Sequence, residues 1–114
     1  VQNFLRRQLE RWGFTVEAVA DGRLAVQRHL ELLQQGSPFD LMIMDLTIPG
    51  GMGGRQAMAA ILEHDPDARA IVVSGYCDDP TMARFREAGF RAALTKPFAL
   101  AELAHAIRTA IRRR

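Results

Sequence analysis

The spacing of apolar residues changes several times along the chain, and each change predicts a different secondary-structure element. Apolar side chains recur at helical spacing in five segments, around 4–12, 24–33, 58–62, 82–86 and 100–111. Gly13, Gly36 and Gly89 are predicted to close the first, second and fourth of these helices. The last helix is expected to bury one stripe, which consists of Leu100, Leu103, Ala104, Ile107 and Ile111.

Four shorter apolar segments are predicted to be strands. They cover residues 15–20, 41–44, 70–73 and 91–95. The second and third are too continuously apolar for a half-exposed strand and suit parallel strands that are buried on both faces. Helices and strands then alternate as αβαβαβαβα. This order predicts a doubly wound α/β fold with a parallel sheet and helices on both faces, in which the first strand is absent.

Length and composition limit the class of protein. With 114 residues, 48% of them apolar, the chain is predicted to form one domain whose core needs no disulfide. The single cysteine, Cys77, cannot pair within the chain, and no apolar run suits a signal peptide or a membrane span. We therefore expect a protein of the reducing cytoplasm without membrane insertion.

The basic residues and the histidines do not indicate a nucleic-acid or metal site. The formal net charge is +2, and the cluster at 112–114 is interpreted as the last turn of a helix, where cations are favourable. His29, His64 and His105 are scattered over three predicted helices without ligand spacing. We expect them to be surface or boundary residues rather than metal ligands or phosphorelay donors.

A carboxylate, a hydroxyl and an ammonium group each stand at the carboxyl end of a predicted strand. The second strand stops at Asp45, the third stops at Ser74, and Lys96, the only lysine, follows the fourth. In an open parallel sheet these ends lie side by side and border the crevice in which such sheets bind ligands. The combination indicates a phosphoryl-transfer site, in which Asp45 accepts the group and the other two side chains hold its oxygens.

Over essentially its whole length, the chain resembles the receiver domains of two-component response regulators. Residues 45–54 resemble the family's phosphoacceptor strand and loop, 74–75 its pair of a hydroxyl and a small residue, and 96–98 its lysine motif with a cis Lys-Pro peptide. The resemblance implies a single receiver domain over 1–114 with a flavodoxin-like sheet of strand order 2-1-3-4-5. The absent first strand would lie between the first two predicted strands.

The resemblance also implies how the site works. A carboxylate oxygen of Asp45 would attack a phosphohistidine on a histidine kinase or a histidine phosphotransfer domain, while Lys96 and Ser74 hold the phosphoryl oxygens. Mg²⁺ would be bound by Asp45, the backbone carbonyl of Thr47 and further carboxylates. The family carries those carboxylates at the end of its first strand, which would precede Val1. We therefore expect an N-terminally truncated domain with an incomplete magnesium site, or a strand donated by a partner chain.

Departures from the family pattern bear on signalling. Ala93 stands three positions before the lysine, where the family usually has an aromatic residue, and Tyr76 is a candidate for its signalling role. The extra glycine at 50–51 resembles receivers attached to hybrid histidine kinases. The resemblance implies an output face, which is also a site for self-association, on the helix after Asp79, the strand 91–95 and the final helix.

Two other functions fit part of the pattern. A haloacid-dehalogenase-type phosphatase also uses a strand-end Asp, a Ser or Thr and a Lys. It needs a second Asp two residues after the nucleophile, where this chain has Thr47. The other is a degenerate receiver that serves only as a protein-binding module. Phosphate uptake by a version that carries the first strand would distinguish the receiver from both.

Overall fold

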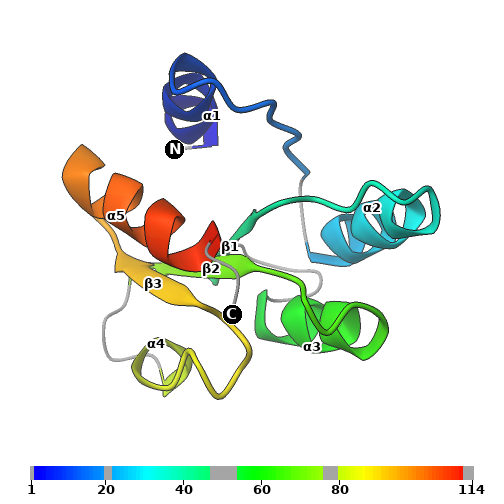
Figure 1. The fold of residues 1–114 in the computed structure, drawn as a ribbon. Coiled ribbons are helices and arrows are strands. Elements are labelled where there is room, and N and C mark those ends of the chain that lie inside the picture. Colours follow the sequence, from blue (N-terminus) through cyan, green and yellow to red (C-terminus); the bar gives the residue numbers. More distant parts are fainter. Residues whose placement is uncertain (1, 20–21, 47–53, 76–79, 112–114) are drawn as a thin grey trace.

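From α2 onward, helices and strands alternate along the chain around one parallel sheet (Figure 1). The computed structural model describes residues 2–19, 22–46, 54–75 and 80–111. The helices are α1 (Gln2–Arg11), α2 (Gly22–Gln34), α3 (Gly54–His64), α4 (Pro80–Ala83) and α5 (Leu100–Ile111). The strands are β1 (Met42–Asp45), β2 (Ala70–Ser74) and β3 (Ala92–Thr95). Within these described ranges, no helix has both the length and the apolar character needed to cross a bilayer.

The sheet has three strands in the order β1-β2-β3, and both pairs are parallel. Met42 is level with Ala70, and Ile71 is level with Ala92. Every residue of β2 is buried, as expected for a parallel strand that is covered on both faces. Helices α1 and α5 lie on one side of the sheet and helices α3 and α4 on the other (Figure 1). The parallel α/β sheet with helices on both faces is therefore confirmed.

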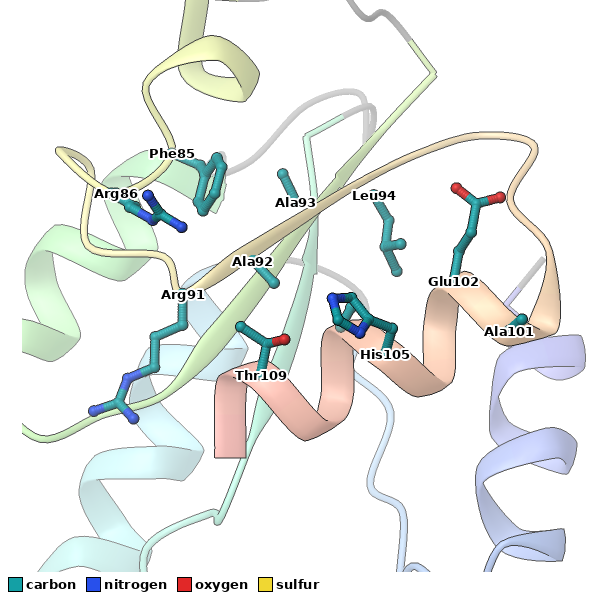
Figure 2. A pocket seen from close by; sticks show the side chains of 11 residues that line it. Phe85, Arg86, Arg91, Ala92, Ala93, Leu94, Ala101, Glu102, His105 and Thr109 are labelled. Atoms are coloured by element: carbon teal, nitrogen blue, oxygen red, sulfur yellow. The ribbon is translucent and has the colours of Figure 1, made fainter. Parts of the chain in front are cut away.

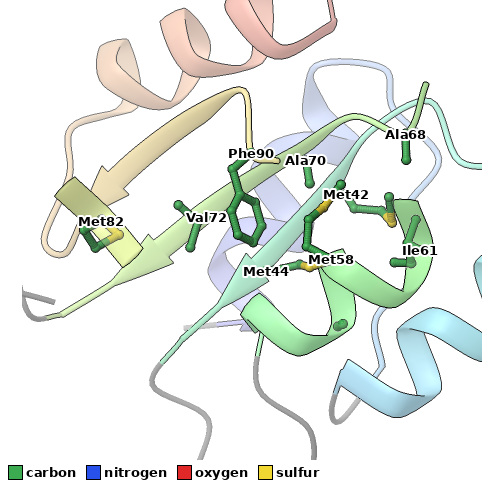
Figure 3. Close-up of a cluster of buried hydrophobic side chains, with 10 residues drawn as sticks. Met42, Met44, Met58, Ile61, Ala68, Ala70, Val72, Met82 and Phe90 are labelled. Carbon is green, nitrogen blue, oxygen red and sulfur yellow. The ribbon is translucent and has the colours of Figure 1, made fainter. Parts of the chain in front are cut away.

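Each face of the sheet has its own hydrophobic core. On the α5 side, Ile71 and Val73 of β2 pack with Leu103 and Ile107, and Leu5 and Leu9 of α1 pack against the edge of this cluster. The opposite core lies between the sheet and α3 (Figure 3). It contains Met42, Met44, Ala57, Met58, Ile61, Ala68, Ala70, Val72, Met82 and Phe90. The alternating pleat of each strand divides its side chains between the two cores.

The strand predicted at 15–20 is not present in the described residues. Residues 14–19 lie outside any helix or strand, and residue 20 is outside the described ranges. The physical reason is that a strand is stabilised by backbone hydrogen bonds to a neighbour, and β1 forms its ladder with β2. In the described residues the segment 14–19 forms no ladder with β1. The space expected for the absent first strand is therefore not filled by direct pairing of these two segments.

Segment 14–19 is instead tied to α2 by an ion pair. Arg28 Nε donates to both carboxylate oxygens of Glu17 at 3.1 and 3.0 Å, and Arg28 Nη2 donates to Oε1 at 2.9 Å. These hydrogen bonds hold the pKa of the Glu17 carboxyl below its ordinary value of 4.5, and they raise the pKa of the Arg28 guanidinium. Both side chains remain substantially exposed, so solvent screens the pair and its contribution to stability is small.

Acid is expected to release this contact. Because the pKa of Glu17 is lower in the folded chain, its contribution to stability is fully present above about 4.5 and is lost as the pH falls through the folded-state value. Glu17→Gln should therefore lose slightly less stability than the unchanged chain between neutral pH and acid. Urea unfolding at both pH values measures the difference. If both proteins lose the same amount of stability between neutral and acid pH, the ion pair between Glu17 and Arg28 does not contribute to stability as described.

Helix ends follow the glycine signals, but one helix is shorter than predicted. Gly13, Gly36 and Gly89 all have positive φ, at 93°, 79° and 99°. After Gly89, Phe90 N donates to Phe85 O at 2.9 Å, which closes a Schellman motif. The regular helix, however, ends at Ala83, and turns continue to the glycine. Between Ala83 and Gly89, backbone hydrogen bonds include ones that span three residues, such as Gly89 N to Arg86 O at 3.1 Å. Hydrogen bonds of this kind wind the backbone more tightly than an α-helix does.

Helix α5 is confirmed at the predicted position, but it buries a different stripe. Its buried residues are Leu103, Ala106, Ile107 and Ala110. Leu100 is 42% exposed, so the prediction that it belongs to the buried stripe is wrong. The small side chains of two alanines let the helix approach the sheet closely, and a pattern weighted towards large apolar residues overlooks them.

The prediction that His29 is a surface or boundary residue is wrong. Its side chain is fully buried, and its Nε2 lies 2.8 Å from Oδ2 of Asp65. The ring stacks on Phe39 with centroids 5.8 Å apart and 25° between the planes. His29 therefore joins α2 to the end of α3. A sequence signal was available, because His29 has helical spacing with Val26 and Leu33, which are apolar positions of the same helix. His64 and His105 are exposed, as predicted.

Candidate functional site

The carboxyl ends of the three strands lie level with one another at one edge of the sheet. In the β1–β2 ladder, Asp45 is level with Val73, and in the β2–β3 ladder Ser74 is level with Thr95. Lys96 follows directly. The parallel pairing therefore places Asp45 and Lys96 on either side of the end of β2, which is the edge where open α/β sheets bind ligands.

Backbone hydrogen bonds extend this pairing beyond the strands. Leu46 N donates to Val73 O at 2.8 Å, just after Asp45. Lys96 N donates to Ser74 O at 2.8 Å, and the Lys96–Pro97 peptide is cis, as the resemblance implied. The backbones that carry Asp45 and Lys96 are therefore both attached to β2, which is fully buried.

The side chains of Asp45 and Lys96 meet across the end of β2. Lys96 Nζ donates a hydrogen bond to Asp45 Oδ2, and the two form an ion pair. Their side chains are 27% and 24% exposed, so solutes can reach the pair. Ser74 is fully buried beside them in the sheet. A carboxylate held against an ammonium group at a sheet edge can act as a nucleophile while the cation neutralises incoming negative charge.

Close packing of α3 supports this edge. A Cβ at Gly54, the first residue of α3, would lie 3.2 Å from Leu46 Cδ2 and 3.4 Å from Met44 Cβ. The glycine thus lets the start of α3 approach the end of β1 closely. This contact positions the backbone next to Asp45.

Some predicted site residues lie outside the described ranges. Thr47, whose carbonyl was the second expected magnesium ligand, falls in 47–53, and Tyr76 and Cys77 fall in 76–79. Mg²⁺ prefers an octahedron of oxygen ligands. The described residues contain no group of three or more His, Cys, Asp or Glu side chains that could hold a metal ion. The carboxylate of Asp45 suits Mg²⁺, but the described residues do not complete a site around it.

Comparisons with known sequences agree with one another. A family model described as "response regulator receiver domain" matches residues 1–108. The response regulator GacA of Pseudomonas aeruginosa is 35% identical over 79 residues, which cover 69% of this chain and 36% of GacA. The sensor kinase CckA of Brucella abortus is 33% identical over 108 residues, which cover 90% of this chain and 10% of the kinase. The chain thus spans about a third of the GacA length and a tenth of the CckA length.

Solved structures share the fold. One is the N-terminal domain of a response regulator/sensory box/GGDEF protein from Carboxydothermus hydrogenoformans. It has a TM-score of 0.80 at 22% identity and covers 97% of this chain and 85% of its own. Another is the receiver domain of a sensor histidine kinase from Pseudomonas aeruginosa, solved with magnesium in its active site cleft. It has a TM-score of 0.80 at 25% identity and covers 96% of this chain and 87% of its own. These neighbours confirm the flavodoxin-like architecture.

Proposed function

The chain belongs to the response regulator receiver domain family of two-component signalling, and on that premise we propose that Asp45 is its phosphoacceptor. The observation that carries the proposal is the ion pair between Asp45 and Lys96 at the carboxyl edge of the sheet. A nucleophilic carboxylate needs a nearby cation when its target is a phosphoryl group with negative oxygens, and Lys96 supplies that cation. We propose that the whole chain, 1–114, acts as one receiver domain.

Each residue of the site has a distinct role in the proposed transfer. One oxygen of Asp45 attacks the phosphorus of a phosphohistidine on a histidine kinase or phosphotransfer domain. The new O–P bond forms while the N–P bond breaks, and the bonding electrons stay on the imidazole nitrogen. The Lys96 ammonium then pairs with one phosphoryl oxygen, and the Ser74 hydroxyl donates to another. The protein therefore contributes alignment and charge neutralisation rather than turnover of a substrate.

Magnesium, when bound, would neutralise phosphoryl oxygens in this site. We propose that Asp45 and the backbone carbonyl of Thr47 are among its ligands. Two receiver structures with the same fold were solved with magnesium, one of them in its active site cleft. The described residues do not complete an oxygen cage around Asp45.

An alternative is a degenerate receiver that acts only by binding proteins. A phosphatase of the haloacid-dehalogenase type is disfavoured, because Thr47 replaces the acid that such an enzyme needs. For the receiver, we propose that signalling and self-association use the output face, defined here as α4 with the following turns to 89, β3 and α5. The CckA match supports a sensor-kinase context for this chain. In that context the phosphate donor and this chain would act in the same signalling pathway.

Phosphate chemistry tests the proposal. A version of the chain that carries, ahead of Val1, a strand ending in two carboxylates is incubated with Mg²⁺ and acetyl phosphate. We expect a single phosphate per chain that is acid-labile and is released by hydroxylamine, as an acyl phosphate must be. A label that resists hydroxylamine would place the phosphate on another residue type, and the absence of any label would favour the degenerate receiver.

A further inference from the structure

Strand β3 has an open side in the part of the chain that the structure describes. It pairs with β2 on one side, and the sheet order places no described strand on the other. Lys96 N, just after β3, donates to Ser74 O at 2.8 Å, and with the register of the β2–β3 ladder this places the backbone groups of Ala92 and Leu94 towards β2. Since successive residues of a strand direct their backbone groups to opposite sides, those of Ala93 and Thr95 face outward. Such an edge is a template for another strand.

A groove of about 480 Å³ follows this open edge. One wall is formed by Phe85 and Arg86 from the turns after α4, and the other by His105 and Thr109 of α5 (Figure 2). Ala93 points to the same side of β3 as Phe85 (Figure 2). Because Ala93 is small, it leaves space beside the ring of Phe85 that a large apolar side chain can occupy. Ala92, Ala93 and Leu94 of β3 line the groove between the two walls.

Charges are distributed unequally along the groove. The Arg86 guanidinium lies over the Phe85 ring, 5.3 Å from its centroid. Arg91 lies at the start of β3, where its Nη1 donates to Ala110 O at 3.2 Å. The carboxylate of Glu102 accepts a hydrogen bond from Ala99 N at 3.0 Å and stands near the opposite end. An acidic group is therefore favoured near the start of β3 and disfavoured near its end.

We propose that the open edge of β3 binds an extended segment of a partner protein as an additional strand. Main-chain hydrogen bonds to Ala93 and Thr95 provide the affinity, and alternate side chains provide the specificity. A large apolar side chain of the partner segment fills the space beside Ala93, and an acidic residue of the same segment lies near Arg86. The proposal rests on the assignment of the output face above, but it does not need Asp45 to be phosphorylated.

A synthetic peptide tests the binding mode. The probe is a nine-residue peptide of alternating threonine and valine with a central tryptophan and one terminal glutamate, titrated into the isotope-labelled 114-residue chain. We expect saturable shifts of the backbone amides of Ala93 and Thr95, which face the open edge of β3. N-methylation of alternate peptide amides along one edge should weaken binding by roughly tenfold or more, because it removes ladder hydrogen bonds. N-methylation along the other edge should have little effect.

Matched variants test the side-chain contacts. Ala93→Tyr fills the space beside Phe85 and should weaken peptide binding roughly tenfold. Ala59→Tyr, at an exposed position on α3, should leave it unchanged. Arg86→Glu should weaken binding by roughly threefold to tenfold, and Arg55→Glu, also exposed on α3, should not.

The inference would be overturned by the absence of saturable peptide binding or by a bound peptide that is helical. Equal effects of the two N-methylated peptides, or unchanged peptide binding to Ala93→Tyr, would also overturn it. If concentrating the chain without peptide shifts the same amides and added peptide causes no further saturable shift, the inference is also overturned, because the occupant of the edge is then a second copy. Failure of phosphate uptake with intact peptide binding would reject only the role of Asp45. The reverse result would reject only the strand-binding groove.

Discussion

Asp45→Ala is expected to take up no phosphate from acetyl phosphate in the version of the chain that carries a first strand. The substitution removes the only oxygen nucleophile that the proposal assigns to the transfer. Lys96→Met keeps Asp45 but removes the cation that contacts Oδ2, and it should slow phosphate uptake by about a hundredfold or more. Initial rates of phosphate incorporation, measured with radiolabelled acetyl phosphate, give both effects.

Asp40→Ala is the matched control for this experiment. Asp40 is an exposed aspartate just before β1, at the opposite end of the strand that Asp45 ends. Its removal should leave the rate of uptake unchanged, because it lies away from the carboxyl edge of the sheet. Phosphate at the full level in Asp45→Ala would show that another residue accepts it. A full rate in Lys96→Met would show that the ion pair has no part in the transfer.

Gly89→Ala is expected to lower the free energy of unfolding by about 2–4 kcal/mol. The residue has a φ of 99°, which a residue with a Cβ adopts only at a cost. A Cβ there would also lie 2.3 Å from Leu62 Cδ1, so the Leu62 side chain or its surroundings must shift. Urea unfolding followed by circular dichroism measures the loss, and an unchanged m-value would show that both proteins unfold in the same way.

Gly13→Ala separates the two causes of that loss. Gly13 has a similar φ of 93°, but nothing lies within 4 Å of a Cβ at this position, so only the backbone cost of about 1–2 kcal/mol should appear. In a Leu62→Ala background, Gly89→Ala should cost about as much as Gly13→Ala, because the overlapping atom is gone. Equal losses for the two glycine variants in the unchanged chain would mean that Leu62 moves aside without cost.

The sequence located the three candidate site residues because each follows a buried strand. A polar residue that interrupts such an apolar run marks the point where the strand leaves the core, and this is local information. Asp45, Ser74 and Lys96 could therefore be assigned to one edge of the sheet. Their mutual position could not be predicted in the same way. The contact between Lys96 and Asp45 depends on the register of β1 and β3 against β2, and the residues that set that register are far apart in sequence.

The sequence by itself determined the elements whose hydrogen bonds are local or whose burial is complete. These include the helices that end at a glycine with positive φ and the continuously apolar β2. Only the tertiary structure decided the state of 14–19, the burial of His29 and the face that α5 turns inward. The reason is that a strand needs a neighbouring strand, a buried imidazole needs a partner such as Asp65, and a helix packs on the face that fits the sheet. None of these partners is encoded in the local pattern of the segment that needs it.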